Sequence, residues 1–157
     1  MIDKTPSSFE NCLILLSSAL EFKINKNNIM NSLIIDAARK KICLTLIKDE
    51  NIYSISHENS KTNYEKLTIL IDEFIKFYDL KIDKISKLYV NRGPGSFAGI
   101  RNSLAVVKAI FVAKKIDYYC FSFGDFGDLT SYKYENVPSL CDKFKIKKNL
   151  INPIYLS

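Results

Sequence analysis

The spacing of apolar residues switches between strand-like and helix-like along residues 32–123. Residues 42–47 are apolar on both faces, as in a strand inside a sheet. A polar turn at residues 49–51 separates them from residues 52–55, which predicts a hairpin. The five predicted strands are residues 32–37, 42–47, 52–55, 87–91 and 118–123.

Two segments between these strands have helical spacing. Residues 62–80 carry apolar side chains at three- and four-residue steps, and residues 99–115 predict a second helix that is apolar nearly all round in its middle. Three strands followed by alternating helices and strands predict an α/β fold, a mixed five-stranded sheet with crossover helices. We interpret it as the half-unit found in the actin, hexokinase and heat-shock ATPase superfamily.

The chain divides into three parts by composition. Residues 1–29 read as an N-terminal extension, because the buried-strand pattern begins abruptly after Met30. We therefore expect Met30 to be the natural start, and a chain beginning there to fold; the alternative is a real N-terminal arm. Residues 30–124 form the predicted lobe, and residues 125–157 a reduced C-terminal tail with a basic, linker-like stretch at 143–148 and a short last strand at 154–156.

Composition excludes several classes of protein. The 157 residues are 47% hydrophobic and 25% charged, which indicates a globular chain with its own core. No apolar run approaches the ~20 residues of a membrane span. The four cysteines are far apart and His57 is the single histidine, so a zinc site is not expected. We expect a reducing, cytoplasmic location, and the net charge of +6 permits contact with nucleic acid without requiring it.

One glycine-rich segment stands out, between the strand at 87–91 and the second helix. Residues 93–101 read Gly-Pro-Gly-Ser-Phe-Ala-Gly-Ile-Arg. Ser96 is placed to cap the helix, and a glycine in the first turn lets another backbone approach closely. The segment is either a tight strand-to-helix turn or an anion or partner contact at a helix N-terminus. It is not a Walker A loop, because no Gly-Lys-Ser/Thr ends it.

This segment closely resembles the signature of the TsaB (YeaZ) family. The residues that carry the resemblance are Gly93, Pro94, Gly95, Ser96, Phe97, Gly99, Arg101 and Lys108. The family normally has Thr at the position of Ala98, and a His-Ser pair where this chain has Thr62-Asn63. The opening strand ending at Asp36 and the last residues 153–156 are also similar to the family.

The resemblance implies an actin-like ATPase fold without catalytic activity. Such proteins pair with the related subunit TsaD, which transfers a threonylcarbamoyl group to the adenosine beside the anticodon of certain tRNAs, and an ATPase, TsaE, joins the complex. The resemblance thus implies a heterodimer subunit of tRNA modification that meets tRNA through the complex, with no cofactor and no membrane. Family members carry a second lobe, which we expect to be strongly reduced here.

The residues themselves also argue against independent catalysis. Asp36 is followed by Ala37-Ala38-Arg39, which offers neither the glycine nor the hydroxyl groups that wrap phosphates in catalytic relatives. No Ser/His/Asp or Cys/His arrangement is discernible. We expect no catalytic and no metal-binding residues, with Asp36 making backbone contacts and His57 at the surface.

The helices indicate a partner instead. Two helices with apolar residues off their main stripe leave an exposed apolar surface that marks an interface, unless residues 1–29 or the tail cover it. The expected interface residues are Ile69, Phe77, Leu104, Ala105, Val106 and Phe111.

Two other functions stay open. One is a self-contained ATPase or phosphotransferase with the actin-like fold, which ATP binding by the purified chain would favour. The other is direct tRNA binding through a set of lysines, for which salt-sensitive binding would be evidence. Those lysines are Lys114, Lys115, Lys143, Lys145, Lys147 and Lys148.

Overall fold

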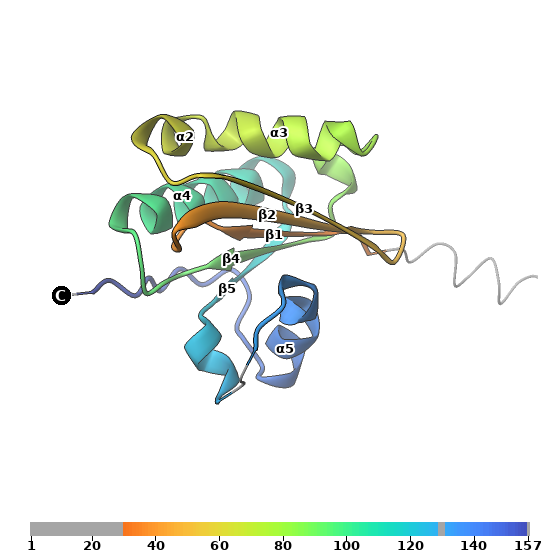
Figure 1. Ribbon diagram of the computed structural model, residues 1–157. Helices are drawn as coiled ribbons and strands as arrows, with labels where there is room; N and C mark the ends of the chain where they lie inside the picture. Colours follow the sequence, from red (N-terminus) through yellow and green to blue (C-terminus); the bar gives the residue numbers. More distant parts are fainter. Residues whose placement is uncertain (1–29, 129–130, 157) are drawn as a thin grey trace, which may run out of the picture.

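A single mixed sheet organises the chain, which the computed structural model describes over residues 30–128 and 131–156 (Figure 1). The strand order is β3-β2-β1-β4-β5. β2 is antiparallel to both of its neighbours, whereas β4 is parallel to β1 and to β5. The strands are β1 (Ser32–Asp36), β2 (Lys41–Lys48), β3 (Asn51–Glu58), β4 (Lys87–Asn91) and β5 (Asp117–Phe121). This confirms the predicted mixed five-stranded α/β sheet.

Three helices cover one face of the sheet and supply the crossovers that the parallel strands need (Figure 1). They are α2 (Lys61–Glu65), α3 (Leu67–Phe77) and α4 (Phe97–Lys114). A short 3-10 turn, η1 (Ile82–Lys84), leads from α3 to β4. The core between the helices and the sheet is built from aliphatic side chains such as Leu33, Ile35, Leu44, Ile71, Val90 and Leu104.

The single helix predicted over residues 62–80 is two helices in the structure. α2 is capped by Ser60, whose Oγ accepts a hydrogen bond from the Asn63 N–H at 3.2 Å, and Lys66 separates α2 from α3 with φ −95° and ψ 9°. α3 ends before Leu80, because Asp79 has a φ of 54° and the Leu80 N–H turns back to the Ile75 carbonyl. This left-handed residue followed by a backward hydrogen bond is a common way to end a helix.

The C-terminal residues pack against the other face of the sheet (Figure 1). They form η2 (Phe123–Phe126), η3 (Tyr134–Asn136) and α5 (Val137–Lys143). Their apolar side chains meet β1, β4 and β5 in a second core made of Ile34, Tyr89, Phe121, Phe123, Phe126, Val137 and Cys141. Both faces of the sheet are therefore covered within the described residues, and the segment expected as a tail takes part in the fold.

Two expectations about this C-terminal segment were wrong. The basic stretch at 143–148 is not a free linker, since Lys148 forms a β-bridge with Tyr119 and the Asn149 N–H donates to the Tyr118 carbonyl at 2.8 Å. Residues 154–156 do not form a strand: a single backbone hydrogen bond, from the Ile154 N–H to the Arg92 carbonyl at 2.8 Å, holds this end. One bond is too little for a strand, which needs a ladder of them.

The N-terminal extension over residues 1–29 lies outside the described residues. β1 begins at Ser32, two residues after Met30, which is itself exposed.

Candidate functional site

The glycine-rich turn joins β4 to α4 and is held by two polar anchors. Ser96 caps α4, as its sequence position predicted: its Oγ accepts from the Gly99 N–H at 3.2 Å. The Tyr64 hydroxyl lies within hydrogen-bond distance of both the Asn59 side-chain oxygen and the same Ser96 Oγ, the latter at 2.9 Å. The turn is thereby fixed to the α2 end of the helical layer.

The glycines of this turn are needed for close backbone contact. A Cβ added to Gly95 would overlap the Ala38 carbonyl, and one added to Gly99 would overlap the Ala37 carbonyl. The Ser96 N–H also donates to the Ala38 carbonyl at 2.8 Å. The β1–β2 turn thus fills the space that the missing side chains leave, and these two glycines act in packing.

Asp36 lies fully buried at the end of β1, where three donors surround its carboxylate. The Ala38 N–H donates to Oδ1 at 3.0 Å, which confirms the expected backbone contact. The Asn91 amide donates to Oδ2 at 3.0 Å, and the Tyr134 hydroxyl donates to the same oxygen at 2.7 Å. Burial, and then the charge of Asp36, raise the pKa of Tyr134, so this hydroxyl stays a donor. Asp36 therefore has a structural role, joining β1, β4 and η3.

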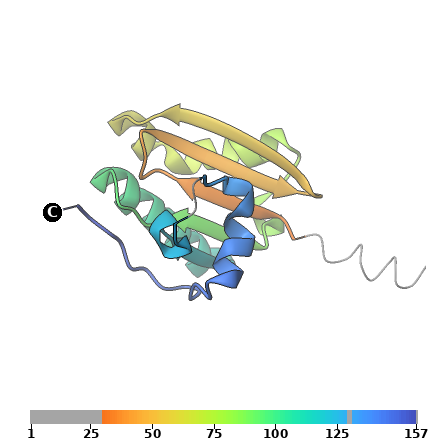
Figure 2. The same ribbon diagram turned by 60° about the horizontal axis from the view of Figure 1, so that its bottom comes forward.

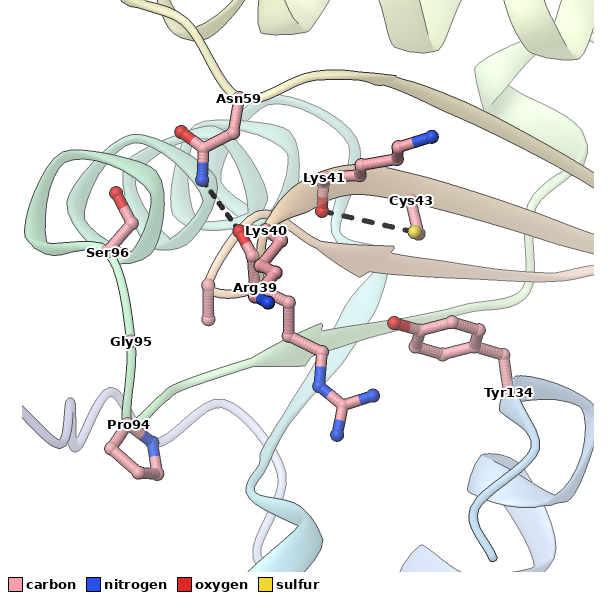
Figure 3. A pocket seen from close by; sticks show the side chains of 10 residues that line it. Arg39, Lys40, Lys41, Cys43, Asn59, Pro94, Gly95, Ser96 and Tyr134 are labelled. Carbon is pink, nitrogen blue, oxygen red and sulfur yellow. Dashed lines mark hydrogen bonds between the residues drawn. The ribbon is translucent and has the colours of Figure 1, made fainter.

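A basic cavity of about 910 Å³ opens beside this cluster (Figure 3). The consecutive side chains of Arg39, Lys40 and Lys41 are exposed at it, and the guanidinium of Arg39 lies 4.6 Å from the centre of the Phe123 ring. Its lining comprises Ala38, Arg39, Lys40, Lys41, Cys43, Asn59, Pro94, Gly95, Ser96 and Tyr134. With three cations and no carboxylate in its lining, the cavity suits an anionic ligand. Sequence reasoning missed it, although the run of three basic residues after β1 was visible.

The remaining signature residues do not line this cavity. Phe97 is 58% exposed and packs against Tyr155, with the ring centres 4.9 Å apart. Arg101 and Lys108 are exposed on α4, and the Lys108 ammonium lies 5.3 Å from the centre of the Phe111 ring. The structure brings the residues from Gly93 to Gly99 together in one turn, and leaves Arg101 and Lys108 along the helix.

The residues expected at a partner interface fall in three environments. Ile69 is 54% exposed, Ala105 is exposed and Val106 is half-buried. Leu104 was expected at the interface, and this was wrong. Its side chain is 4% exposed and belongs to the core, because it points from α4 toward the sheet. Ile69, Ala105 and Val106 are the ones on or beside the outer surface of the α3–α4 layer.

The two aromatic residues of that set lie at opposite flanks of the helical layer. Phe111 is half-buried with its ring edge against Tyr118 of β5, at 5.7 Å between centres. Phe77 is 80% exposed at the end of α3 and contacts the neighbouring Tyr78, which stacks on Tyr53 of β3.

Two hollows run between the helices on this outer side. One of about 250 Å³ lies between α2, the start of α3 and α4, and one of about 170 Å³ lies further along, between α3, η1 and α4. Thr68 and Val106 line both. The exposed positions of α4 include five small residues, Ala98, Ala105, Ala109, Val112 and Ala113, alongside the larger Phe97, Arg101, Lys108 and Lys114. A helix of another protein could approach this surface closely.

Within residues 30–128 and 131–156, no three His, Cys, Asp or Glu side chains gather as a metal site would require. His57 is half-buried in β3 and lines a separate hollow against α3. In the same part of the chain, no helix combines the length and the apolarity that crossing a membrane would take.

The fold is an α/β half-unit of the actin-like kind, a mixed five-stranded sheet with crossover helices, and its glycine-rich turn packs on the β1–β2 turn. Among solved structures it is similar to YeaZ from Pseudomonas aeruginosa, with a TM-score of 0.56 and 17% identity over 60% of this chain. A crystal structure of an uncharacterized protein with similarity to peptidase YeaZ from Pseudomonas aeruginosa matches with the same values. The chain spans 44% of the length of either structure. No known protein-family profile matches it.

Proposed function

We propose that this chain is a non-catalytic, TsaB-like subunit that pairs with a TsaD-like catalytic subunit in the threonylcarbamoyl modification of tRNA. The likeness of fold to YeaZ and the signature residues of the glycine-rich turn support the assignment. In this proposal residues 30–124 are the actin-like lobe, residues 125–157 are the C-terminal segment, and the protein works in the cytoplasm. A TsaE-like ATPase joins the complex, and tRNA is met through the catalytic subunit.

The observation that carries the proposal is the outer surface of α3 and α4. Ile69, Ala105 and Val112 leave apolar area exposed there, and two hollows lie between the helices. Exposed apolar area next to hollows of this size is typical of a helix-binding surface. Leu104 and Phe77 are not part of it, because Leu104 is in the core and Phe77 lies on the side of β3.

The state of the β1–β2 turn supports the absence of catalysis. Asp36 is fully buried and already accepts hydrogen bonds from Ala38, Asn91 and Tyr134, so its carboxylate is not free to hold a metal ion. The backbone of Ala37 and Ala38 is packed against the glycine-rich turn. Catalysis would then belong to the partner.

The test is co-purification with a TsaD-like subunit of the same organism. Ala105→Glu and Ala109→Glu place a charge on the exposed side of α4 and should weaken pairing at least about tenfold while the single chain keeps its circular dichroism and melting temperature. Leu104→Asp should unfold the chain itself. Ser139→Glu, an exposed position of α5 on the other face of the sheet, is the matched control and should pair normally. Pairing that survives both alanine replacements would contradict the proposal.

The basic cavity favours a second function, a self-contained ATPase or phosphotransferase. Arg39, Lys40 and Lys41 supply the positive charge that a nucleotide phosphate needs. Calorimetric titration of the purified chain with Mg-ATP tests it, with a triple glutamine variant of these residues as control. Binding that the variant loses, together with ATP hydrolysis, would favour this function over the first.

The six lysines named in the sequence analysis are candidates for direct contact with tRNA. All six candidate lysines are exposed, and two of them form ion pairs: Lys114 with Asp83 at 2.8 Å and Lys148 with Asp117 at 2.9 Å. Salt-sensitive tRNA binding that is lost on replacing Lys143, Lys145 and Lys147 together would assign these three this role.

A further inference from the structure

The two edge strands of the sheet, β5 and β3, differ in how far other parts of the chain cover them. At the β5 edge, the bridge between Tyr119 and Lys148 and the hydrogen bonds between Tyr118 and Asn149 cover the strand. At the other edge lies β3, eight residues long, with β2 as its one neighbour among the described residues (Figure 2). Natural sheets protect such an edge with proline, charged side chains or a bulge. Apart from Glu58 at its last position β3 has none of these, and it exposes Ile52 (46%) and Ile55 (40%).

The hairpin determines which backbone groups of β3 point outward. Asp49 and Glu50 form a two-residue turn with φ of 51° and 65°, closed by the pair Lys48 and Asn51. In such a hairpin the closing pair is hydrogen-bonded, and bonded and non-bonded pairs then alternate. The odd-numbered residues of β3 therefore bond to β2, and the even-numbered ones present their N–H and C=O groups at the edge. These are Ile52, Ser54, Ser56 and Glu58.

We propose that the β3 edge binds a second copy of this chain, antiparallel, around a two-fold axis at Ile55. This register uses all four outward-facing residues: Ile52 bonds with Glu58 of the second copy, and Ser54 with Ser56 of the second copy. Ile55 then lies opposite itself in a non-bonded pair, where side chains are closest. The result is one ten-stranded sheet across two copies.

The charges at the two ends of β3 match this arrangement. The turn Asp49–Glu50 places two exposed carboxylates at the start of the strand. At the other end lie the exposed cations Arg39, Lys40, Lys41 and Lys61 together with two exposed carboxylates, Glu58 and Glu65. The Glu65 carboxylate lies 4.0 Å from the Lys61 ammonium, and this end keeps an excess of positive charge. Antiparallel pairing brings the acidic end of each copy to the basic end of the other. Parallel pairing would bring like charges together at both ends, so the charge pattern selects the two-fold arrangement.

Apolar contact adds to the backbone bonds. On the side of β3 that faces α3, Ile55 and His57 line a hollow of about 290 Å³ together with Phe74 and Phe77. Phe77 is 80% exposed beside it. In the proposed register Ile55 of the second copy lies at the mouth of this hollow, which would bury apolar area on both copies. The α4 part of the surface in the proposed function lies over β4 and β5, whereas this hollow lies between β3 and α3.

The experiment uses the full chain and measures its mass in solution by light scattering over a concentration series up to about 100 μM. The wild type should reach the mass of two chains. Ile55→Lys places one lysine from each copy face to face at the axis and should give one-chain mass with unchanged circular dichroism. Glu50→Lys and Lys61→Glu should each weaken the dimer roughly three- to tenfold, and the double reversal should restore it. Lys145→Glu, a reversal on the α5 side, is the matched control.

Hydrogen exchange locates the interface. Amides of Ile52, Ser54, Ser56 and Glu58 should be protected in the wild-type dimer and exchange freely in Ile55→Lys. A wild type that stays at one-chain mass at the highest concentration would overturn the proposal, as would a dimer that Ile55→Lys leaves intact. A third outcome would also overturn the proposal: these amides are protected in a one-chain species, and the protection is lost when residues 1–29 are removed. That result would assign the β3 edge to residues 1–29.

Discussion

The hydroxyl of Tyr134 donates to the carboxylate of Asp36 across 98 positions of sequence, at an O–O distance of 2.7 Å. Asp36 ends β1, and Tyr134 begins the short turn η3. The contact joins the C-terminal segment to the centre of the sheet and closes one side of the basic cavity.

We expect Tyr134→Phe to lower the free energy of unfolding by about 1.5–3 kcal/mol, because a buried carboxylate loses a donor. Tyr132→Phe is the matched control: its hydroxyl donates to the Gly127 carbonyl in an exposed position, so the loss should be about 1 kcal/mol or less. Chemical denaturation measures both. Equal effects of the two replacements would contradict the structural role of the Asp36 cluster.

Gly99→Ala should destabilise the chain by at least about 2 kcal/mol. The added methyl group would overlap the Ala37 carbonyl, which is backbone and cannot rotate away. Gly124→Ala is the control, since its Cβ would meet only the Ser122 hydroxyl, at 3.7 Å. Thermal melting compares them, and a melting temperature of Gly99→Ala at the wild-type value would show that this turn is looser than described.

Asp117 should make stability depend on pH in the acid range. Its hydrogen bond from Asn149, and then that from Lys148, lower its pKa below 3.8. Between that value and the lower folded one, the unfolded state binds more protons, so the stabilisation is present at neutral pH and is lost as the pH falls below about 4. Because Asp117 is at the surface, the contribution should stay below about 1 kcal/mol.

Asp117→Asn tests this dependence. The variant should lose less stability than the wild type between pH 6 and pH 3, as measured by urea denaturation at each pH. Asp128→Asn, at another exposed aspartate, serves as control. A variant whose pH dependence matches the wild type would show that Asp117 does not fasten residues 148 and 149.

Cys120 and Cys141 should resist alkylation in the native chain. Burial raises the pKa of each thiol to about 12, which leaves about one thiolate in 10⁴ at pH 8. Cys43, which is half-buried, is the internal comparison. Peptide mapping after iodoacetamide treatment should find Cys120 and Cys141 modified only after denaturation. Native modification of Cys141 at the rate of Cys43 would mean that α5 does not stay packed on the sheet.

The order of the elements followed from the sequence. Apolar spacing places the five strands and the crossover helices, since a buried strand and an amphipathic helix differ in period whatever lies around them. Local signals were also sufficient for Ser96 as the cap of α4 and for the hairpin turn after β2. Such features depend on residues only a few positions away, so the local sequence is enough to predict them.

Contacts between distant segments were decided by the tertiary structure alone. The basic cavity needs the β1–β2 turn, the glycine-rich turn and Tyr134 together, and no periodicity links residues so far apart. The burial of Leu104 beside the exposed Ala105 depends on how α4 is rotated about its axis, which an evenly apolar helix does not reveal. The packing of residues 132–149 on the second face of the sheet could not be predicted either. A short helix and two turns carry too few apolar residues for their spacing to indicate which surface they cover.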